Sequence, residues 1–333
     1  MDFINLGLRM PRICLTESNF ATMKRIILFF LVLFGLTAVQ AQVVVDLKKG
    51  GPTVKSKTLK DYDHQGRDER ALREDSVQYV DCLRRAFNAL ATDSLPQAEA
   101  LFKEALHLRP DAKGNYVVWR NLGLISLARV EMRQAIERFT KALLAQPGDQ
   151  ESRYNRAKAY FLLNNFAETI ADCDIFLKQD ATNLLADSVH LLRAAAKVEL
   201  RQYAAARAEL TDLLTRKPNK SEAHLLLLCI LQAEGRLQEM RAETIKFCKN
   251  CPNNKQDLVM FLDGTKQTGD KEEAKIIYDA LLEDAPDNGL YRIERAKILL
   301  ALGQKQAARE DLKIARRSGI PSAAWKELEQ KLK

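Results

Sequence analysis

Residues 116–147 read YVVWRNLGLISLARVEMRQAIERFTKALLAQP, and this stretch decides the fold of the chain. The helical periodicity of its apolar residues is interrupted near residues 129–133, so we interpret the stretch as two helices joined by a tight turn. Gly123 in the first helix and Ala135 in the second are small, which allows the two helix backbones to approach closely. Pro147 has no N–H and clashes with a continuing helix, so it ends the second helix.

The same pattern recurs along the chain with a period of about 34 residues. Five of the nine prolines lie on one ladder of this period: Pro110, Pro147, Pro218, Pro252 and Pro286. The last three are separated by 34 residues each, and two three-residue additions, near Lys113 and Leu184, lie between repeats. A repeated helix–turn–helix unit explains this spacing better than a chain of unrelated elements.

Two columns of mostly small residues follow the same ladder. The column in the first helices contains Ala86, Gly123, Ala157, Ala194, Leu228, Leu262 and Ala296. The column in the second helices contains Ala98, Ala135, Thr169, Ala206, Met240, Ala274 and Ala308. These columns predict seven helix pairs between about residues 79 and 322, with small residues wherever two backbones meet.

The spacing W-x2-L-G, then A-x3-F and a terminal proline, resembles the tetratricopeptide repeat (TPR), a helix–turn–helix unit. The resemblance implies an all-α solenoid of about seven antiparallel helix pairs, wound as a right-handed superhelix. We expect residues 66–320 to form this solenoid. Residues 321–333 are expected to form a capping helix, in which Trp325 and Leu328 cover the open face of the last repeat.

Residues 23–41 are typical of a secretory signal peptide. Lys24 and Arg25 form its charged beginning, and residues 26–36 form an apolar run of 11 residues. As a helix, such a run rises only about 16 Å, which is too short for a bilayer core of about 30 Å. An uncleaved membrane anchor is the alternative interpretation.

Cleavage is expected before Gln42, because residues 39–41 (VQA) offer the small side chains that a signal peptidase reads. We expect translation to start at Met23, with residues 1–22 as a spurious extension. No cysteine lies directly after the apolar run, so the pattern predicts an exported bacterial protein of the periplasm or cell envelope rather than a lipoprotein.

Residues 42–65 are interpreted as a flexible, basic linker, since they contain too few apolar residues for a core. Its lysines are Lys48, Lys49, Lys55, Lys57 and Lys60. A solvated tether is the favoured reading. The alternative is peripheral contact with anionic lipid headgroups of a membrane, or with acidic partners.

The net charge of the chain is +8, and without residues 1–41 it is +6, from 48 basic and 42 acidic side chains. These charges are interspersed along the helices, as on a solvated surface. The chain has no basic stripe with interleaved aromatic residues, so we expect no nucleic-acid partner.

The resemblance implies that the first helix of each repeat lines a concave groove in which a protein or peptide partner binds. Spacings of three, four and three place one residue per turn on that face. The residues predicted to contact the partner are Arg120, Leu124, Leu127, Tyr154, Lys158, Phe161 and Leu191. Tyr154 and Phe161 are the expected anchors. The alternative is that some of these side chains pack against neighbouring repeats.

Some members of this family bind the C-terminal carboxylate of chaperones through a clamp of Lys, Arg and Asn. Asn121 and Asn155 lie at suitable positions for such a clamp. The flanking basic positions do not follow, because Leu83 and Phe87 precede Asn121 and Glu151 follows it. We therefore do not expect this clamp.

Cys248 and Cys251 form the only CxxC motif. They are expected at a helix C-terminus, just before Pro252, where the helix dipole does not favour a thiolate. A local disulfide or two free thiols are both compatible with this position. A thiol–disulfide protein that uses this pair is the alternative function.

The sequence contains no recognisable catalytic, phosphate-binding or metal-binding motif. A zinc site would need two ligands besides the CxxC pair, and the four histidines are not paired at metal spacing. We therefore expect no metal, no cofactor and no small-molecule substrate. The chain is predicted to be a non-enzymatic scaffold or adaptor.

Overall fold

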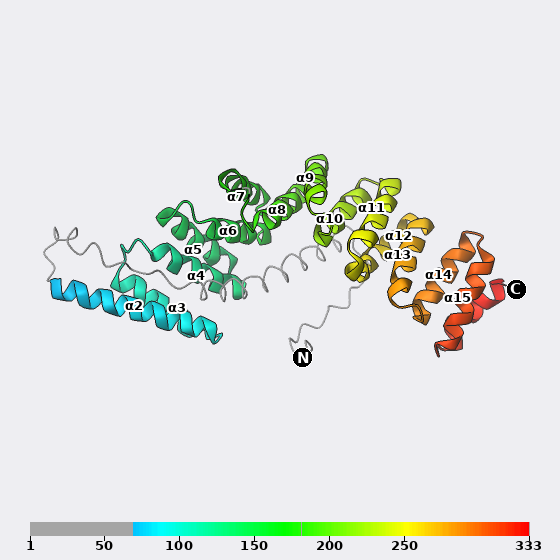
Figure 1. Ribbon diagram of the computed structural model, residues 1–333, viewed down its shortest axis with the longest axis horizontal. Helices are drawn as coiled ribbons and strands as arrows, with labels where there is room; N and C mark the ends of the chain where they lie inside the picture. Colours follow the sequence, from blue (N-terminus) through cyan, green and yellow to red (C-terminus); the bar gives the residue numbers. More distant parts are fainter. Residues whose placement is uncertain (1–68, 181, 333) are drawn as a thin grey trace.

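The chain forms an elongated all-α array of paired helices, seen from the side in Figure 1. This computed structural model describes residues 69–180 and 182–332; the predicted signal peptide and linker lie outside them. The first helices of the seven pairs are α2 (Glu69–Ala91), α4 (Asn115–Ala128), α6 (Gln150–Leu162), α8 (Ala186–Glu199), α10 (Ser221–Ala233), α12 (Val259–Thr268) and α14 (Gly289–Ala301). The second helices are α3 (Leu95–Leu108), α5 (Met132–Ala145), α7 (Phe166–Gln179), α9 (Tyr203–Arg216), α11 (Leu237–Asn250), α13 (Lys271–Asp284) and α15 (Lys305–Arg317).

These pairs confirm the predicted fold class and the helix register. The described ranges contain no β-strand. The two predicted additions appear as longer connections between pairs, at residues 109–114 and 180–185, whereas α5 and α6 are joined by residues 146–149 alone. The first helix of the first pair, α2, is longer than the others, with 23 residues.

Both columns of small residues lie inside the array. All fourteen positions are buried, and most of the alanines are fully inaccessible. A Cβ atom added to Gly123 would lie 2.5 Å from Cε1 of Phe139, so only glycine allows α4 and α5 to come this close. The two columns of small residues therefore mark the positions where helix backbones meet.

The turn inside each pair has the same geometry in all seven repeats. One residue per turn adopts a left-handed conformation: Asp93, Val130, Asn164, Arg201, Gly235, Gly269 and Gly303. At the end of α4, Val130 N–H donates to the Leu127 carbonyl at 3.0 Å, and Glu131 N–H donates to the Ser126 carbonyl at 2.9 Å. This pattern caps the last carbonyls of a helix and turns the chain sharply. Val130 is unusual because a β-branched residue rarely tolerates a φ of 63°.

The hydrophobic core runs along the array rather than around one centre. Phe102, Phe139, Phe176 and Phe247 are completely buried in the second helices α3, α5, α7 and α11. The largest cluster extends without a break from α6 to α13, and smaller clusters join it at both ends. Each repeat is thus stabilised mainly by its two neighbours.

Repeat 6 departs from the pattern. Its first helix is replaced by a 3-10 segment, η2 (Pro252–Leu258), followed by the short α12. The ammonium of Lys255 in η2 is held by Glu283 at 2.7 Å and Asp284 at 3.1 Å, both at the end of α13. Here α11 packs directly against α13, whereas in other repeats a second helix packs chiefly against the next first helix, as α5 does against α6.

The C-terminal cap is present, although it starts with a 3-10 turn, η3 (Ser322–Ala324), before α16 (Lys326–Leu332). Leu328 and Leu332 are buried against residues of repeat 7, and Trp325 packs beside them. The Trp325 indole N–H donates to the Ile320 carbonyl at 3.2 Å, so its polar atom is satisfied. The cap covers the last repeat as predicted.

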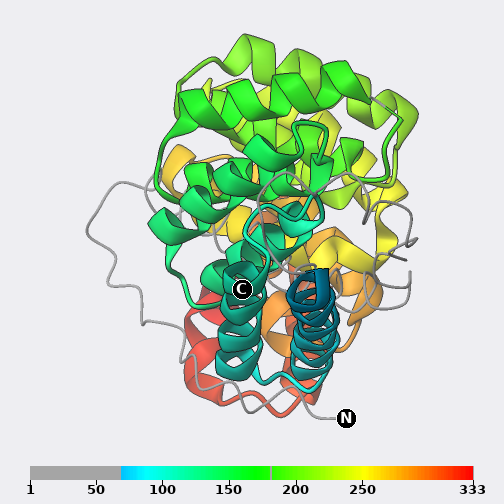
Figure 2. The ribbon, with the colours of Figure 1, turned by 90° about the vertical axis from the view of Figure 1, so that its left-hand side faces the viewer.

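The array winds about its long axis. In Figure 2, viewed along that axis, the green helices in the middle of the chain lie at the top, while the blue α2 and the red helices near the C-terminus lie in the lower half. Contacts between α4 and α6, α6 and α8, and α8 and α10 place these four first helices side by side as one inner row.

Candidate binding surface on the first helices

The inner row of first helices defines the candidate surface. Along α6, Glu151, Tyr154, Lys158 and Phe161 follow the three–four–three spacing and occupy one face. The contacts between α4, α6 and α8 bring three first helices side by side. The predicted residues therefore lie on three neighbouring helices, but they differ in accessibility.

Four of the seven predicted contact residues are buried. Leu124, Leu127, Phe161 and Leu191 expose between 2% and 6% of their surface. Leu124 and Leu127 pack with Ala159 of the next repeat, and the Phe161 ring packs edge-on against Phe166 at 5.4 Å. The packing alternative therefore describes these four residues, and Phe161 is not a solvent-facing anchor.

Arg120 joins two neighbouring repeats. Its guanidinium lies 3.0 Å from the carboxylate of Asp149 and 2.9 Å from that of Glu151. Asp149 also accepts a hydrogen bond from the Ser152 hydroxyl at 2.5 Å, at the start of α6. Two carboxylates thus offset the charge of Arg120, which reduces its attraction for an acidic ligand.

Tyr154 and Lys158 form the accessible part of the predicted set. Both are half-buried, and the Lys158 ammonium lies 5.2 Å from the centre of the Tyr154 ring. Burial raises the pKa of the Tyr154 hydroxyl to about 12, against the opposing effect of a hydrogen bond with Ser188 of α8. Burial lowers the pKa of Lys158 to about 8. The pair offers an aromatic face and a partly desolvated cation at the contact between two first helices.

A hollow of about 260 Å³ on repeats 6 and 7 was not predicted from the sequence. It lies between α12, α13 and α14, and its walls include Leu262, Ala274, Tyr278, Ile298 and Ala301. The short α12 leaves this space, so the helical spacing alone gave no signal of it. An apolar side chain of a partner fits such a wall better than a charged group.

In several repeats, a buried acidic residue of the second helix forms ion pairs with basic residues of the preceding first helix. Glu209 is bound by His190, Arg193 and Lys197 at 2.6 to 2.8 Å. Related clusters form around Asp172, Glu243 and Asp311. Burial acts to raise the pKa of Glu209, but the hydrogen bonds from His190, Arg193 and Lys197 hold it at about 2. In the sequence, these clusters are visible as a basic residue 16 or 19 positions before an acidic residue. Their role is structural, because each joins the two helices of a pair.

Cys248 and Cys251 lie at the end of α11, as predicted, and both thiols are free. Burial raises the pKa of Cys248 to about 11, and burial also raises the pKa of Cys251. Thiolate is the reactive form, so these shifts disfavour redox chemistry at neutral pH.

The two asparagines considered for a carboxylate clamp are committed to their own helices. Asn121 donates to the Val117 carbonyl at 2.8 Å, and Asn155 donates to the Glu151 carbonyl at 2.9 Å. Both are buried. Within residues 69–180 and 182–332, no group of His, Cys, Asp and Glu has metal-binding geometry. No helix of the described chain has the length and apolarity needed to span a membrane.

Comparison with known proteins agrees with this architecture. The tetratricopeptide repeat family model matches residues 120–183 and 266–324. A tetratricopeptide repeat protein from Parabacteroides merdae ATCC 43184 is similar in structure, with a TM-score of 0.55 and 20% identity over 77% of this chain and 98% of that one. PilW, a type IV pilus biogenesis factor, has a TM-score of 0.50 and 22% identity over 62% of this chain and 94% of its own. Among curated protein sequences, none matches this chain.

Proposed function

We propose that this chain, a member of the tetratricopeptide repeat family, is a non-enzymatic adaptor that binds a segment of another protein. Proteins of this family are generally interaction modules, and the described helices form the stacked array that such modules use. The extended surface of a solenoid suits a long peptide or a helix better than a small molecule.

The partner segment binds along the inner row at repeats 3 and 4, with Tyr154 as its anchor. The observation that carries this proposal is the half-buried pair of Tyr154 and Lys158 beside Ser188. Aromatic residues contribute a large share of binding energy at interfaces. The ammonium of Lys158 favours a segment that carries a carboxylate next to its apolar anchor.

The site of action that we propose is the bacterial cell envelope. The support is the sequence of residues 23–41, which has the charged start, the apolar run and the small residues of a signal peptide. N-terminal sequencing of the protein purified from envelope fractions tests this part. A mature chain that begins at Gln42 supports export, and recovery of residues 1–41 refutes cleavage at this site.

A photo-crosslinking experiment tests the surface directly. Tyr154 is replaced by a photoreactive phenylalanine in one variant, and Leu144 of α5 in a control. Leu144 is 77% exposed but lies on a second helix. A discrete crosslinked product from position 154 alone is expected. The same products from both positions, or none from either, would defeat the assignment to the inner row.

Affinity measurements with the crosslinked partner follow. Tyr154→Ala is expected to cost about 1–2 kcal/mol of binding free energy. The pKa of Lys158 is about 8, so its charge is lost as the pH rises through that value. Binding of an acidic segment is therefore expected to weaken between about pH 7 and pH 9. Lys158→Gln should remove this pH dependence, and circular dichroism melts separate lost binding from lost stability.

A further inference from the structure

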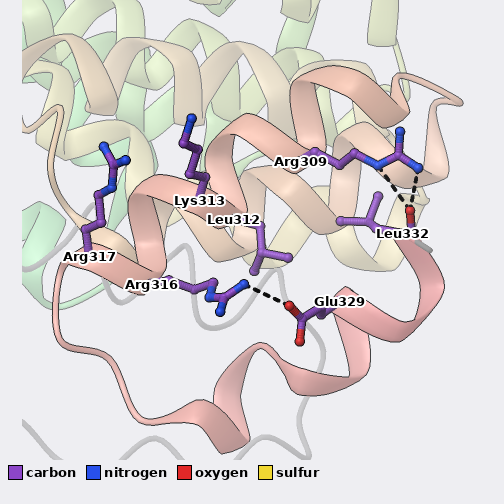
Figure 3. A pocket seen from close by; sticks show the side chains of 7 residues that line it. All are labelled: Arg309, Leu312, Lys313, Arg316, Arg317, Glu329 and Leu332. Carbon is purple, nitrogen blue, oxygen red and sulfur yellow. Dashed lines mark hydrogen bonds and ion pairs between the residues drawn. The ribbon is translucent and has the colours of Figure 1, made fainter.

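The far end of the array carries an open pocket of about 420 Å³ between α15 and α16 (Figure 3). Its volume lies within the range of about 300–1,000 Å³ that is usual for ligand sites. The residues that line it are Arg309, Leu312, Lys313, Arg316, Arg317, Glu329 and Leu332. Four of these seven side chains are basic and one is acidic.

Two of the four cations are engaged by the cap. Arg309 donates twice to the Leu332 carbonyl, at 3.1 and 2.6 Å, which fixes the end of α16. Arg316 lies 2.8 Å from the carboxylate of Glu329, and its guanidinium stacks 4.8 Å from the Trp325 ring. These contacts hold the pocket open in one shape, because each joins α15 to the capping segment.

The other two cations, Lys313 and Arg317, are exposed, and neither makes a hydrogen bond or an ion pair within the part of the chain described here. They are four residues apart on α15, so they lie on the same face. Figure 3 shows both pointing the same way, away from Glu329, while Arg316 turns toward Glu329. The edge of the pocket therefore presents two adjacent positive charges that the cap does not neutralise.

Basic side chains outnumber acidic ones around the pocket. Residues 305–332 contain seven basic and four acidic side chains. Asp311 is buried and is bound by Arg292 and Arg295 of α14, so its charge faces away from the pocket. Leu312 and Leu332 are 5% and 4% exposed and provide an apolar floor.

We propose that this terminal pocket binds an acidic segment of a partner protein, with two of its carboxylates placed on Lys313 and Arg317. The planar guanidinium of Arg317 matches a carboxylate in two parallel hydrogen bonds, and Lys313 adds a point charge beside it. The leucine floor accommodates the aliphatic part of a glutamate side chain. This interface lies on a second helix and is separate from the inner row of first helices, so it adds a second partner site to the proposed adaptor.

The observations favour a protein segment over a nucleic acid or a membrane. Single-stranded nucleic acids need aromatic side chains on which bases stack, and Trp325, the nearby aromatic residue, is already covered by Arg316. A bilayer surface favours exposed apolar residues next to the cations, whereas both leucines of the pocket are buried.

The test is a titration of the full chain with a fluorescein-labelled hexaglutamate peptide, followed by fluorescence anisotropy. The variant Lys313→Glu/Arg317→Glu is expected to weaken binding by about tenfold or more, because both unpaired charges are reversed. Lys313→Gln/Arg317→Gln should weaken peptide binding less, and this variant still tests the proposal if the charge-reversed variant does not fold. Binding should weaken as the salt concentration rises.

The matched control is Lys178→Glu/Lys249→Glu, which makes the same change in net charge on exposed lysines of α7 and α11. This control should bind the peptide within about twofold of the unchanged chain. Equal losses in both double variants, or no binding by the unchanged chain, would overturn the proposal. Vesicles of roughly equal phosphatidylcholine and phosphatidylglycerol that bind more tightly than the peptide through Lys313 and Arg317 would overturn it in favour of a lipid. The inner row is tested by crosslinking from position 154 and the terminal pocket by this titration, so failure of one proposal is distinguishable from failure of the other.

Discussion

Replacing Val130 with asparagine should stabilise the chain, although it removes an apolar side chain. Val130 occupies the left-handed turn between α4 and α5 with a φ of 63°. An L residue in this conformation costs roughly 1–2 kcal/mol, and the β-branched valine has no local hydrogen bond to offset that cost. Asparagine tolerates the conformation, and Asn164 already occupies the equivalent turn of the next repeat.

The expected gain is about 1 kcal/mol. Val130 is 70% exposed, so the change gives up little buried apolar surface. A gain of this size corresponds to a rise of about 2–4 °C in the melting temperature of a domain of 150–250 residues. Circular dichroism at 222 nm during thermal and urea unfolding measures it.

The control is Val77→Asn in α2. Val77 is also 70% exposed, but its backbone is helical, where valine and asparagine have similar propensities. This variant should melt within experimental error of the unchanged chain, or slightly below it. If Val130→Asn is no more stable than Val77→Asn, left-handed strain does not contribute measurably at this turn, and the reasoning fails.

Three further perturbations test the packing, the buried acids and the thiols. Gly123→Trp should destabilise the chain by several kcal/mol, because even a Cβ atom there would lie 2.5 Å from the Phe139 ring, and overpacking alone costs about 1–3 kcal/mol. Glu209→Gln should cost about 3 kcal/mol at pH 7, since the carboxyl pKa falls from 4.5 to about 2 on folding. In the unchanged chain this stabilisation is complete above pH 4.5 and is lost as the pH falls toward 2. Replacing Cys248 and Cys251 with serine should leave partner binding intact, because both thiols are free and lie away from the inner row.

Each of these measurements has a comparison that can contradict it. Gly148→Trp is the control for Gly123, because the nearest atom to its added Cβ is 3.8 Å away, and equal melting shifts for the two would argue against close helix packing at Gly123. For Glu209, urea titrations between pH 2 and pH 7 should show a smaller acid dependence in the glutamine variant, and identical pH profiles would refute the linkage. Loss of function in the double serine variant, with its fold retained, would favour the redox alternative.

The sequence predicts the repeat register well because each column has a local physical cause. Gly123 and Ala135 are small where two backbones meet, and Pro147 ends a helix wherever it occurs along the ladder. The packing of Leu328 against repeat 7 follows from apolar periodicity in the same way. These features depend on residues that are close in sequence or one repeat apart.

The candidate site was harder to predict, since its accessibility depends on the angle between successive repeats. Helical spacing predicted Leu124, Phe161 and Leu191 as contact residues on the first helices, but it contained no information on how closely neighbouring helices cover them. The break in repeat 6 has a similar origin, because Lys255 is held by two acids at the end of a helix almost 30 residues away. The basic spacing of Lys313 and Arg317 is visible in the sequence, whereas the pocket beside them exists only once α16 folds back onto α15.

The interrupted first helix of repeat 6 changes how the array is stacked. From α4 to α10 each first helix rests against the next, whereas at repeat 6 the second helix α11 packs against η2 and α13. The inner row and the terminal pocket lie on opposite sides of this step. A partner that engages both sites would therefore need two binding segments joined by a connection long enough to pass repeat 6.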